Sequence, residues 1–230
     1  MKLNRRSLIR TAAGSGLILA SGRVALPAES PAQKALLDLF AQRQSVRKYK
    51  STPVPDEHVR MMIDAARRAP TCMNEQPWKF LVVRDKDRIE RMKKSTIDGI
   101  TGYFKKQLEQ KTNVTDADLA PLNEAIARTE GYFTAPVYVV VLVDTQCQCG
   151  ADYQLQDGVL AAGYLMLAAR ALGYGTVYLT DGVPDSVTRE VLEIPQRYRR
   201  ICMTPVGVPD AWPPRKSKKN LEEFVAYEKV

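Results

Sequence analysis

The sequence predicts a single domain built on a mixed β-sheet with helices on its faces. Short runs of apolar, β-branched residues at 79–84 and 137–143 are typical of buried strands. Segments with apolar residues at helical spacing flank and separate these runs, which favours helices packed on a sheet. The 230 residues are 45% apolar and 26% charged, a composition that supports a hydrophobic core and excludes a disordered chain. Residues 29–230 are therefore expected to form one domain without internal repeats.

Two helices are expected before the first strand. The first covers residues 31–42 and ends before a basic run. The second covers residues 56–69, with Asp56 as its predicted N-cap and Pro70 as its stop. Their apolar faces consist of Ala35, Leu36, Leu39 and Phe40 in the first helix and Val59, Met62, Ile63 and Ala66 in the second.

The rest of the chain alternates between helices and strands. Between the two strands lies a charged, mostly helical stretch, in which residues 86–111 are predicted to form a surface excursion and residues 110–118 a loop. Residues 153–172 are apolar almost all round, so this helix is predicted to be buried on several sides, with small residues that allow close approach of another helix, such as one from a second chain. Strands at 176–179 and 200–205, a helix at 184–192 and a proline-rich basic tail beyond residue 207 complete the expected order.

The first 28 residues have the pattern of an export signal. The pair Arg5-Arg6 precedes an uncharged stretch of twelve residues, 11–22, and small residues that end at Ala28. A bilayer-spanning helix needs about 20 residues, so this stretch is too short to be one. The segment is similar to a twin-arginine signal peptide cleaved near Ala28, and it predicts a periplasmic or otherwise exported protein with a cofactor inserted before export. A basic first helix, an uncleaved anchor or a cytoplasmic protein are the alternatives.

Charge and histidine content exclude two classes of function. The formal charge is +8 from 34 basic and 26 acidic residues, but five basic and no acidic residues lie within 1–28, which leaves 29 against 26, or +3, for the rest. With only 7% aromatic residues, no nucleic-acid partner is expected. His58 is the single histidine, so multi-histidine metal centres are excluded and no metal site is predicted. It lies on a charged helix and is expected to be solvated.

The four cysteines do not form a recognisable framework. Cys72, Cys147, Cys149 and Cys202 are too few and too irregularly spaced for a disulfide scaffold. The one-residue gap between Cys147 and Cys149 differs from zinc and iron–sulfur spacing. Free or singly paired thiols are therefore expected.

Two cationic segments, far apart in the sequence, are suited to phosphate. Arg43, Ser45 and Arg47 alternate, so in an extended segment two guanidiniums and a hydroxyl face the same way. The second segment, residues 215–219, is Arg-Lys-Ser-Lys-Lys. Taken alone, each segment is more often a solvated run of charges.

A second candidate site lies at residues 69–78, between a predicted helix and a predicted strand. Pro70 and Pro77 fix the path of the chain, and Asn74 and Gln76 supply carboxamides that both donate and accept hydrogen bonds. Such groups on a rigid turn suit the edge of a planar heterocycle. A capped helix end with Trp78 as core filler is the alternative.

Five motifs in order resemble a known family. They are Arg43-x-Ser45-x-Arg47, Ala69-Pro70 to Asn74-x-Gln76-Pro77-Trp78, Ala171-Leu172-Gly173 before a strand, Pro205-x-Gly207 and Lys216-x-Lys218. Together they resemble the FMN-dependent nitroreductase family over about residues 38–225. The resemblance implies an α+β fold with a mixed, mainly antiparallel sheet flanked by helices. It also implies an interlocked homodimer with two flavins at the interface.

The resemblance also implies a set of site residues. The FMN phosphate would be held by Arg43, Ser45, Arg47, Lys216 and Lys218. The flavin ring would be lined from the partner chain by Pro70, Thr71, Cys72, Asn74 and Gln76, and passed near its reactive nitrogen by Tyr178, Leu179 and Thr180. Because the flavin carries the chemistry, no catalytic side chain is expected. Family members commonly have a small residue at the position of Cys72, so this cysteine is expected to be a passive filler, with a redox role as the alternative.

The implied activity is ping-pong transfer of a hydride or two electrons, through bound FMN, to an electron-poor acceptor such as a nitroaromatic or quinone. NADH or NADPH would be the family's donor. Since an exported protein is not expected to meet free NAD(P)H, a membrane or periplasmic donor such as a quinol or redox protein, or oxidation of the substrate itself, is the hypothesis here. A non-catalytic flavin-binding protein is the alternative of a different class.

Overall fold

The computed structural model describes residues 30–229. The predicted signal segment, residues 1–28, therefore lies outside the described residues. Among residues 30–229, no helix combines the length and apolar character needed to cross a membrane.

The centre of the molecule is a four-stranded antiparallel sheet. Its strands are β1 (Trp78–Val83), β2 (Val137–Asp144), β3 (Gly175–Thr176) and β4 (Tyr198–Gly207), in the order β1-β2-β4-β3. The parallel component is the bridge between Ser45 and Thr176, at the β3 edge. The predicted mixed, mainly antiparallel sheet is therefore confirmed.

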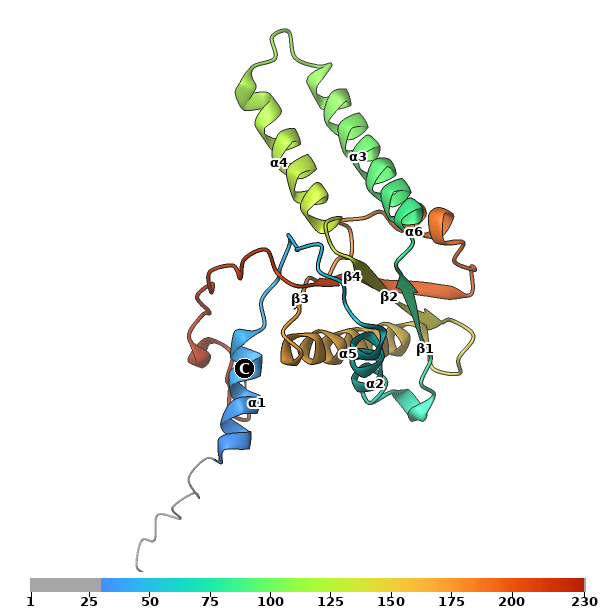
Figure 1. The fold of residues 1–230 in the computed structure, drawn as a ribbon, viewed down its shortest axis with the longest axis vertical. Coiled ribbons are helices and arrows are strands. Elements are labelled where there is room, and N and C mark those ends of the chain that lie inside the picture. Colours follow the sequence, from blue (N-terminus) through green and yellow to red (C-terminus); the bar gives the residue numbers. More distant parts are fainter. Residues whose placement is uncertain (1–29, 230) are drawn as a thin grey trace, which may run out of the picture.

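Helices cover both faces of this sheet. The helices are α1 (Pro31–Gln42), α2 (Asp56–Ala66), α3 (Lys86–Leu108), α4 (Asp116–Tyr132), α5 (Ala151–Ala171) and α6 (Asp185–Leu192), with short 3-10 turns at Cys72–Asn74 and Leu221–Glu223. Figure 1 shows α2 and α5 on one side of the sheet and the base of α3 and α4 on the other, beside α6.

Strand β2 is apolar along its length because it is buried on both faces. Val137 and Val139 pack with α2 and α5, whereas Tyr138, Val140 and Leu142 pack with α3, α4 and α6. A strand with two covered faces has no solvent side on which polar residues would be favoured. This explains why the sequence shows a continuous apolar run here rather than alternation.

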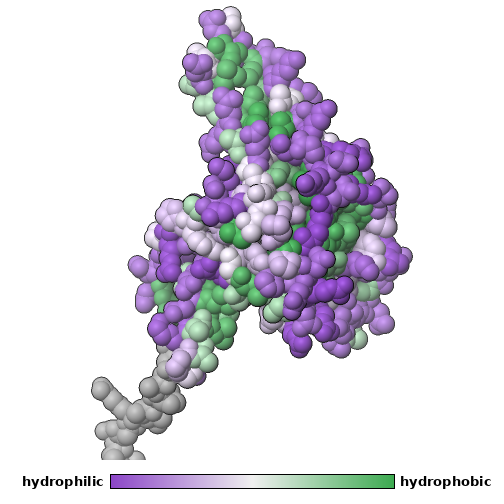
Figure 2. All heavy atoms as spheres, viewed as in Figure 1, coloured by the Kyte–Doolittle hydropathy of each residue, from purple (hydrophilic) through white to green (hydrophobic). Residues whose placement is uncertain are grey.

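The predicted surface excursion is a helical hairpin that projects from the sheet. Helices α3 and α4 pack against each other along the hairpin and meet the core at its base, through Met92 and Tyr132 (Figure 1). Figure 2 shows apolar residues along its length. Helix α4 begins at Asp116, where Thr115 and Asp118 form a capping box. The loop predicted at 110–118 therefore ends at Thr115.

Helix α5 is not buried on several sides, and this prediction was wrong for the single chain. Tyr153, Val159, Leu160 and Tyr164 remain 55%, 42%, 43% and 41% exposed. Gly158 lies against Ile201 of β4, and α5 also packs against α2 on the same side of the sheet. Packing through small residues brings the helix axis close to the strands and leaves the larger apolar side chains outside.

Three local predictions also need correction. Pro55, not Asp56, occupies the N-cap of α2, and the helix ends at Ala66 rather than residue 69. The predicted strand at 176–179 is a strand only at residues 175–176, because Leu179 pairs with Met203 as an isolated bridge. His58 is half-buried, and its Nδ1 lies 2.7 Å from the hydroxyl oxygen of Tyr174, so it is not a freely solvated side chain.

The close approach of α5 to the sheet can be tested with two glycines of the same helix. A Cβ atom at Gly158 would overlap the Ile201 side chain, whereas one at Gly163 would meet nothing within 4 Å. Gly158→Ala should lower the free energy of unfolding by about 1–3 kcal/mol because a packed interface must move. Gly163→Ala should raise it by up to about 1 kcal/mol through reduced backbone entropy of the unfolded chain. Urea denaturation measures both, and equal effects would contradict this packing.

Candidate functional site

The first predicted cationic segment lies along the β3 edge of the sheet. The backbone N–H of Val46 donates to Thr176 O at 2.9 Å, and the Val46 side chain is buried in the core. Successive side chains of an extended segment point to opposite sides. Arg43, Ser45 and Arg47 therefore lie on the side opposite the buried Val46. Arg43 and Ser45 are half-buried, and Arg47 is exposed.

The second cationic segment is brought to the same place by the C-terminal tail. The tail pairs with residues 48–50: the N–H of Asp210 donates to Lys48 O at 3.0 Å, and the N–H of Lys50 donates to Val208 O at 2.9 Å. Further along, the Arg170 guanidinium lies 3.8 Å from the centre of the Trp212 ring. Arg170 also donates to Gln42 Oε1 at 3.0 Å. These contacts attach the tail to both α1 and α5 just before its basic residues.

The two segments line one cavity of about 430 Å³. The lining is formed by the end of α1, the following extended segment and the tail: Phe40, Ala41, Arg43, Gln44, Ser45, Arg47, Pro213, Pro214, Arg215, Lys216 and Lys218. The structure thus brings together the five residues predicted to hold phosphate, although their two segments lie near opposite ends of the sequence. Arg215, which belongs to the predicted second cationic segment, and Gln44 also line the cavity.

This cavity is electrostatically suited to an anion. Five basic side chains line it, and no acidic residue is among the described residues that do so. Within residues 30–229, none of the five forms an ion pair with an acidic side chain. Like charges held together without a counter-charge create a positive potential that a dianion relieves. The side-chain oxygen of Gln44 is buried beside them without a hydrogen-bond partner in the described part of the chain, so the cavity can also engage a donor.

The predicted carboxamide turn is present but lies away from this cavity. Met73, Asn74 and Gln76 have φ values of 50°, 58° and 52°, so three non-glycine residues adopt the left-handed conformation. The Gln76 amide donates to the backbone and side-chain oxygens of Asn74 at 3.3 and 3.2 Å, and both side chains are exposed. Pro70 is exposed, and the hydroxyl oxygen of Thr71 accepts from the N–H of Gln76 at 3.3 Å.

The turn and the cationic cavity meet α5 at different ends. The N–H of Cys72 donates to Asp157, whereas Arg170 lies beside the cavity. At 1.5 Å per residue, these two positions are about 20 Å apart along the helix. Within one chain, the carboxamides therefore do not line the cavity that the cationic residues form.

Cys72 is bonded to Cys149 in a disulfide, so its prediction as a passive filler thiol was wrong. Cys147 and Cys202 are free. The sequence left free thiols and a single pairing both open, and it could not select the partners because 77 positions separate Cys72 from Cys149. The antiparallel pairing of β1 with β2 brings them together, since Cys72 precedes β1 and Cys149 follows β2.

The third predicted group, Tyr178 to Thr180, leads from the sheet into the loop before α6. Tyr178 is half-buried, Leu179 is buried against Met203 and Thr180 is exposed. Burial, together with the neighbouring Cys202, raises the pKa of the Tyr178 phenol to about 12. This hydroxyl is therefore protonated at neutral pH and can donate a hydrogen bond.

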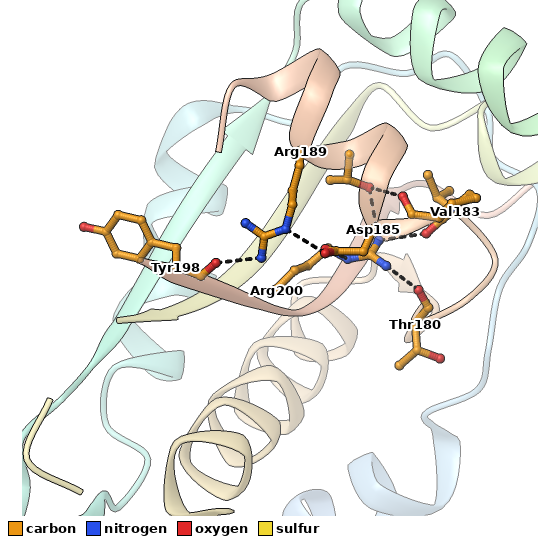
Figure 3. Close-up of polar contacts among 8 residues, drawn as sticks. Thr180, Val183, Asp185, Arg189, Tyr198 and Arg200 are labelled. Carbon is orange, nitrogen blue, oxygen red and sulfur yellow. Dashed lines mark hydrogen bonds and ion pairs between the residues drawn. The ribbon is translucent and has the colours of Figure 1, made fainter. Parts of the chain in front are cut away.

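Arg200 fixes the loop that follows Thr180, and the sequence analysis missed it. Its side chain is only 6% exposed and donates to Thr180 O at 2.7 Å and Val183 O at 2.8 Å. It also forms an ion pair with Asp185, at 3.1 Å (Figure 3). Burial lowers the pKa of the guanidinium, while Asp185 opposes that shift. The available signal was weak, because Arg199 and Arg200 are adjacent basic residues in β4 and only the side chain of Arg200 is buried.

A second hollow, of about 620 Å³, runs along the α3–α4 hairpin from its base. Aromatic side chains of Tyr103, Phe104 and Tyr132 line it, and Asp181 and Gly182 connect it to the loop held by Arg200. Its size is within the range of small-molecule sites.

Comparisons with known proteins agree with this architecture. The Nitroreductase family model matches residues 40–208. An iodotyrosine deiodinase from Thermotoga neapolitana is 31% identical over 185 residues, which is 77% of this chain and 90% of the relative. An NADH dehydrogenase from Thermus thermophilus is 28% identical over 178 residues, 73% of this chain and 83% of the relative. A crystal structure of oxidized iodotyrosine deiodinase bound to FMN and 3-iodo-L-tyrosine superimposes with a TM-score of 0.68 at 25% identity, covering 85% of this chain and 99% of that one.

The fold and the family match define an oxidoreductase. The chain belongs to the nitroreductase family.

The role of Arg200 can be tested against that of its ion-pair partner. Arg200→Gln removes the charged donor from the backbone carbonyls of Thr180 and Val183, so it should lower the free energy of unfolding by about 2–4 kcal/mol. Asp185→Asn removes a carboxylate that is 49% exposed, so its effect should stay below about 1 kcal/mol. Chemical denaturation measures both. A loss from Asp185→Asn as large as that from Arg200→Gln would show that the ion pair, not the carbonyl contacts, stabilises the loop.

Proposed function

We propose that this chain binds FMN with its phosphate in the 430 Å³ cationic cavity and transfers a hydride or two electrons to an electron-poor acceptor, such as a nitroaromatic or quinone. The observation that carries the proposal is the convergence of Arg43, Ser45 and Arg47 with Lys216 and Lys218 at that cavity. The FMN bound in the iodotyrosine deiodinase structure of the same fold supports the choice of cofactor.

The residues of the cavity fit a phosphate monoester. Guanidinium groups can contact two phosphate oxygens at once, lysines add point charges and Ser45 adds a hydroxyl donor. When bound, FMN supplies the redox chemistry. The cationic side chains then neutralise the phosphate and hold it in place, and no acid or base from the chain is required.

A homodimer would complete the site with the carboxamide turn of the partner. Asn74 and Gln76 lie about 20 Å along α5 from the cationic end of their own chain, so a second copy must supply them to a shared cofactor. Exposed apolar residues on α5, and Leu36, Leu37 and Phe40 on α1, offer the surface for such an interface. In this arrangement Pro70 and Thr71 line the ring, and Tyr178, Leu179 and Thr180 pass its reactive edge.

The hollow along the hairpin is the proposed acceptor site, at its end nearest the sheet. It adjoins Asp181, one residue beyond the proposed flavin-lining Thr180, and its aromatic lining suits a planar acceptor. A donor and an acceptor that use one open site in turn would give ping-pong kinetics. The rigid loop held by Arg200 would keep that site aligned with the ring.

The phosphate assignment predicts the colour of purified protein. Arg43→Ala combined with Lys216→Ala removes two charge-assisted contacts worth about 3–6 kcal/mol together, so FMN affinity should fall by about 100-fold or more. The double variant should purify colourless, as measured by flavin absorbance. Lys219→Ala is the matched control, because Lys219 lies in the same segment but pairs with Glu223 at 3.8 Å. Full yellow occupancy in the double variant would show that the phosphate binds elsewhere.

We further propose that the protein is exported through its twin-arginine-type segment and uses a donor other than NAD(P)H. The Cys72–Cys149 disulfide supports export, since such bonds persist mainly in oxidising compartments. A membrane quinol or a redox protein would then be the electron source. The relative named NADH dehydrogenase is the argument for the nicotinamide alternative.

Anaerobic mixing distinguishes the donors. Purified holoprotein should be bleached rapidly by a menaquinol analogue and slowly by NADPH, because the proposed donor meets the protein outside the cytoplasm. The absorbance of the flavin measures both rates, and cell fractionation locates the protein. Rapid bleaching by NADPH alone, with the protein in the cytoplasmic fraction, would contradict both proposals.

A further inference from the structure

The turn at residues 71–76 needs external support. Met73, Asn74 and Gln76 all have positive φ, a conformation that is unfavourable for residues with a Cβ atom. The segment is short and its two carboxamide side chains are exposed, so little core packing holds it. Left alone, such a turn would populate other conformations.

Three contacts tie this turn to the segment that leads into α5. One is the Cys72–Cys149 disulfide. The second is the hydrogen bond from the Cys72 N–H to the buried carboxylate of Asp157, at 3.1 Å. In the third, the carboxylate of Glu75 accepts from the N–H groups of Gln148 and Cys149, at 2.9 and 3.4 Å. All three join the turn to residues 148–157.

The disulfide is the contact that water cannot replace. Glu75 is half-buried, and its contacts can exchange with solvent, whereas a covalent bond persists until it is reduced. Cys147 is the free thiol in the same loop, and its Sγ lies 3.5 Å from Cys149 O. Burial and the neighbouring Glu75 raise the pKa of this thiol, so it stays protonated at neutral pH and is a poor nucleophile toward the disulfide.

We propose that the Cys72–Cys149 disulfide is a positioning element of the cofactor site: it fixes the 71–76 turn so that Asn74 and Gln76 present their carboxamides, and its reduction weakens cofactor binding without unfolding the domain. This inference rests on the proposed FMN site. Because apparent affinity falls with the fraction of protein in the competent conformation, releasing the turn should weaken FMN binding by about tenfold.

The covalent step is an ordinary two-electron reduction. A phosphine such as TCEP attacks one sulfur, the S–S bond breaks, and water supplies the oxygen of the phosphine oxide and the protons of the two thiols. Cys149 is buried and Cys72 is half-buried, so access of the reagent to the bond is restricted. Replacing both cysteines, Cys72→Ser with Cys149→Ser, removes the disulfide without depending on reagent access.

The test measures FMN affinity and amide hydrogen exchange on the mature full-length protein. Apo-protein is titrated with FMN in four forms: oxidised, reduced with TCEP, Cys72→Ser with Cys149→Ser, and Cys147→Ser. The double variant, and the reduced protein where the reagent opens the bond, should bind FMN about tenfold more weakly. They should also show faster exchange at Cys72, Gln148 and Cys149, whose N–H groups make the tethering hydrogen bonds. Cys147→Ser is the matched control and should behave like the oxidised protein.

Three other results would contradict the proposed role of the disulfide or the proposed FMN site. Unchanged affinity and unchanged exchange in the double variant would show that the turn holds without the disulfide. A large fall in Tm with faster exchange throughout the sheet would show a global cross-link rather than a local positioning element. If oxidised protein fails to bind FMN, the proposed function is wrong, and the exchange measurement still decides whether the disulfide fixes the turn.

Discussion

The candidate site depends on backbone pairing that holds like charges together. Hydrogen bonds from Val46 to Thr176, from Lys50 to Val208 and from Asp210 to Lys48 place the 43–50 segment between the β3 edge and the tail. Without this pairing, the mutual repulsion of the basic side chains would separate the two segments. Hydrogen bonds at the edge of the sheet therefore hold the positive cavity together. An anionic ligand would offset the repulsion between its basic side chains and stabilise this arrangement.

The sequence predicted best the features that rest on local pattern. The apolar run at 137–143 predicted β2 because a strand covered on both faces excludes polar residues. Apolar residues at helical spacing predicted α1 at residues 31–42, and the structure adds a capping box at Ser30. The cationic residues were found because alternation in an extended segment is also local. In each case, neighbouring residues carry the information.

Features that depend on tertiary contacts were missed. The partners of Cys72 and Arg200 are set by strand pairing and loop path, which no local pattern encodes. Helix α5 was misjudged because its apolar composition does not show which residues face the sheet. Gly158 lies against β4, whereas Val159 and Leu160 remain exposed. His58 was misjudged because Tyr174 lies beside it only after the fold forms.

The outer part of the α3–α4 hairpin packs largely independently of the sheet. It joins the core mainly at its base, through Met92 and Tyr132, and most of its surface lies beyond the sheet. Substitutions along its outer length therefore change little of the packing on which folding depends. Outer hairpin residues that line the 620 Å³ hollow, such as Tyr103 and Phe104, can therefore be exchanged with little effect on the sheet, so the shape of the hollow and the stability of the core depend on separate stretches of the chain.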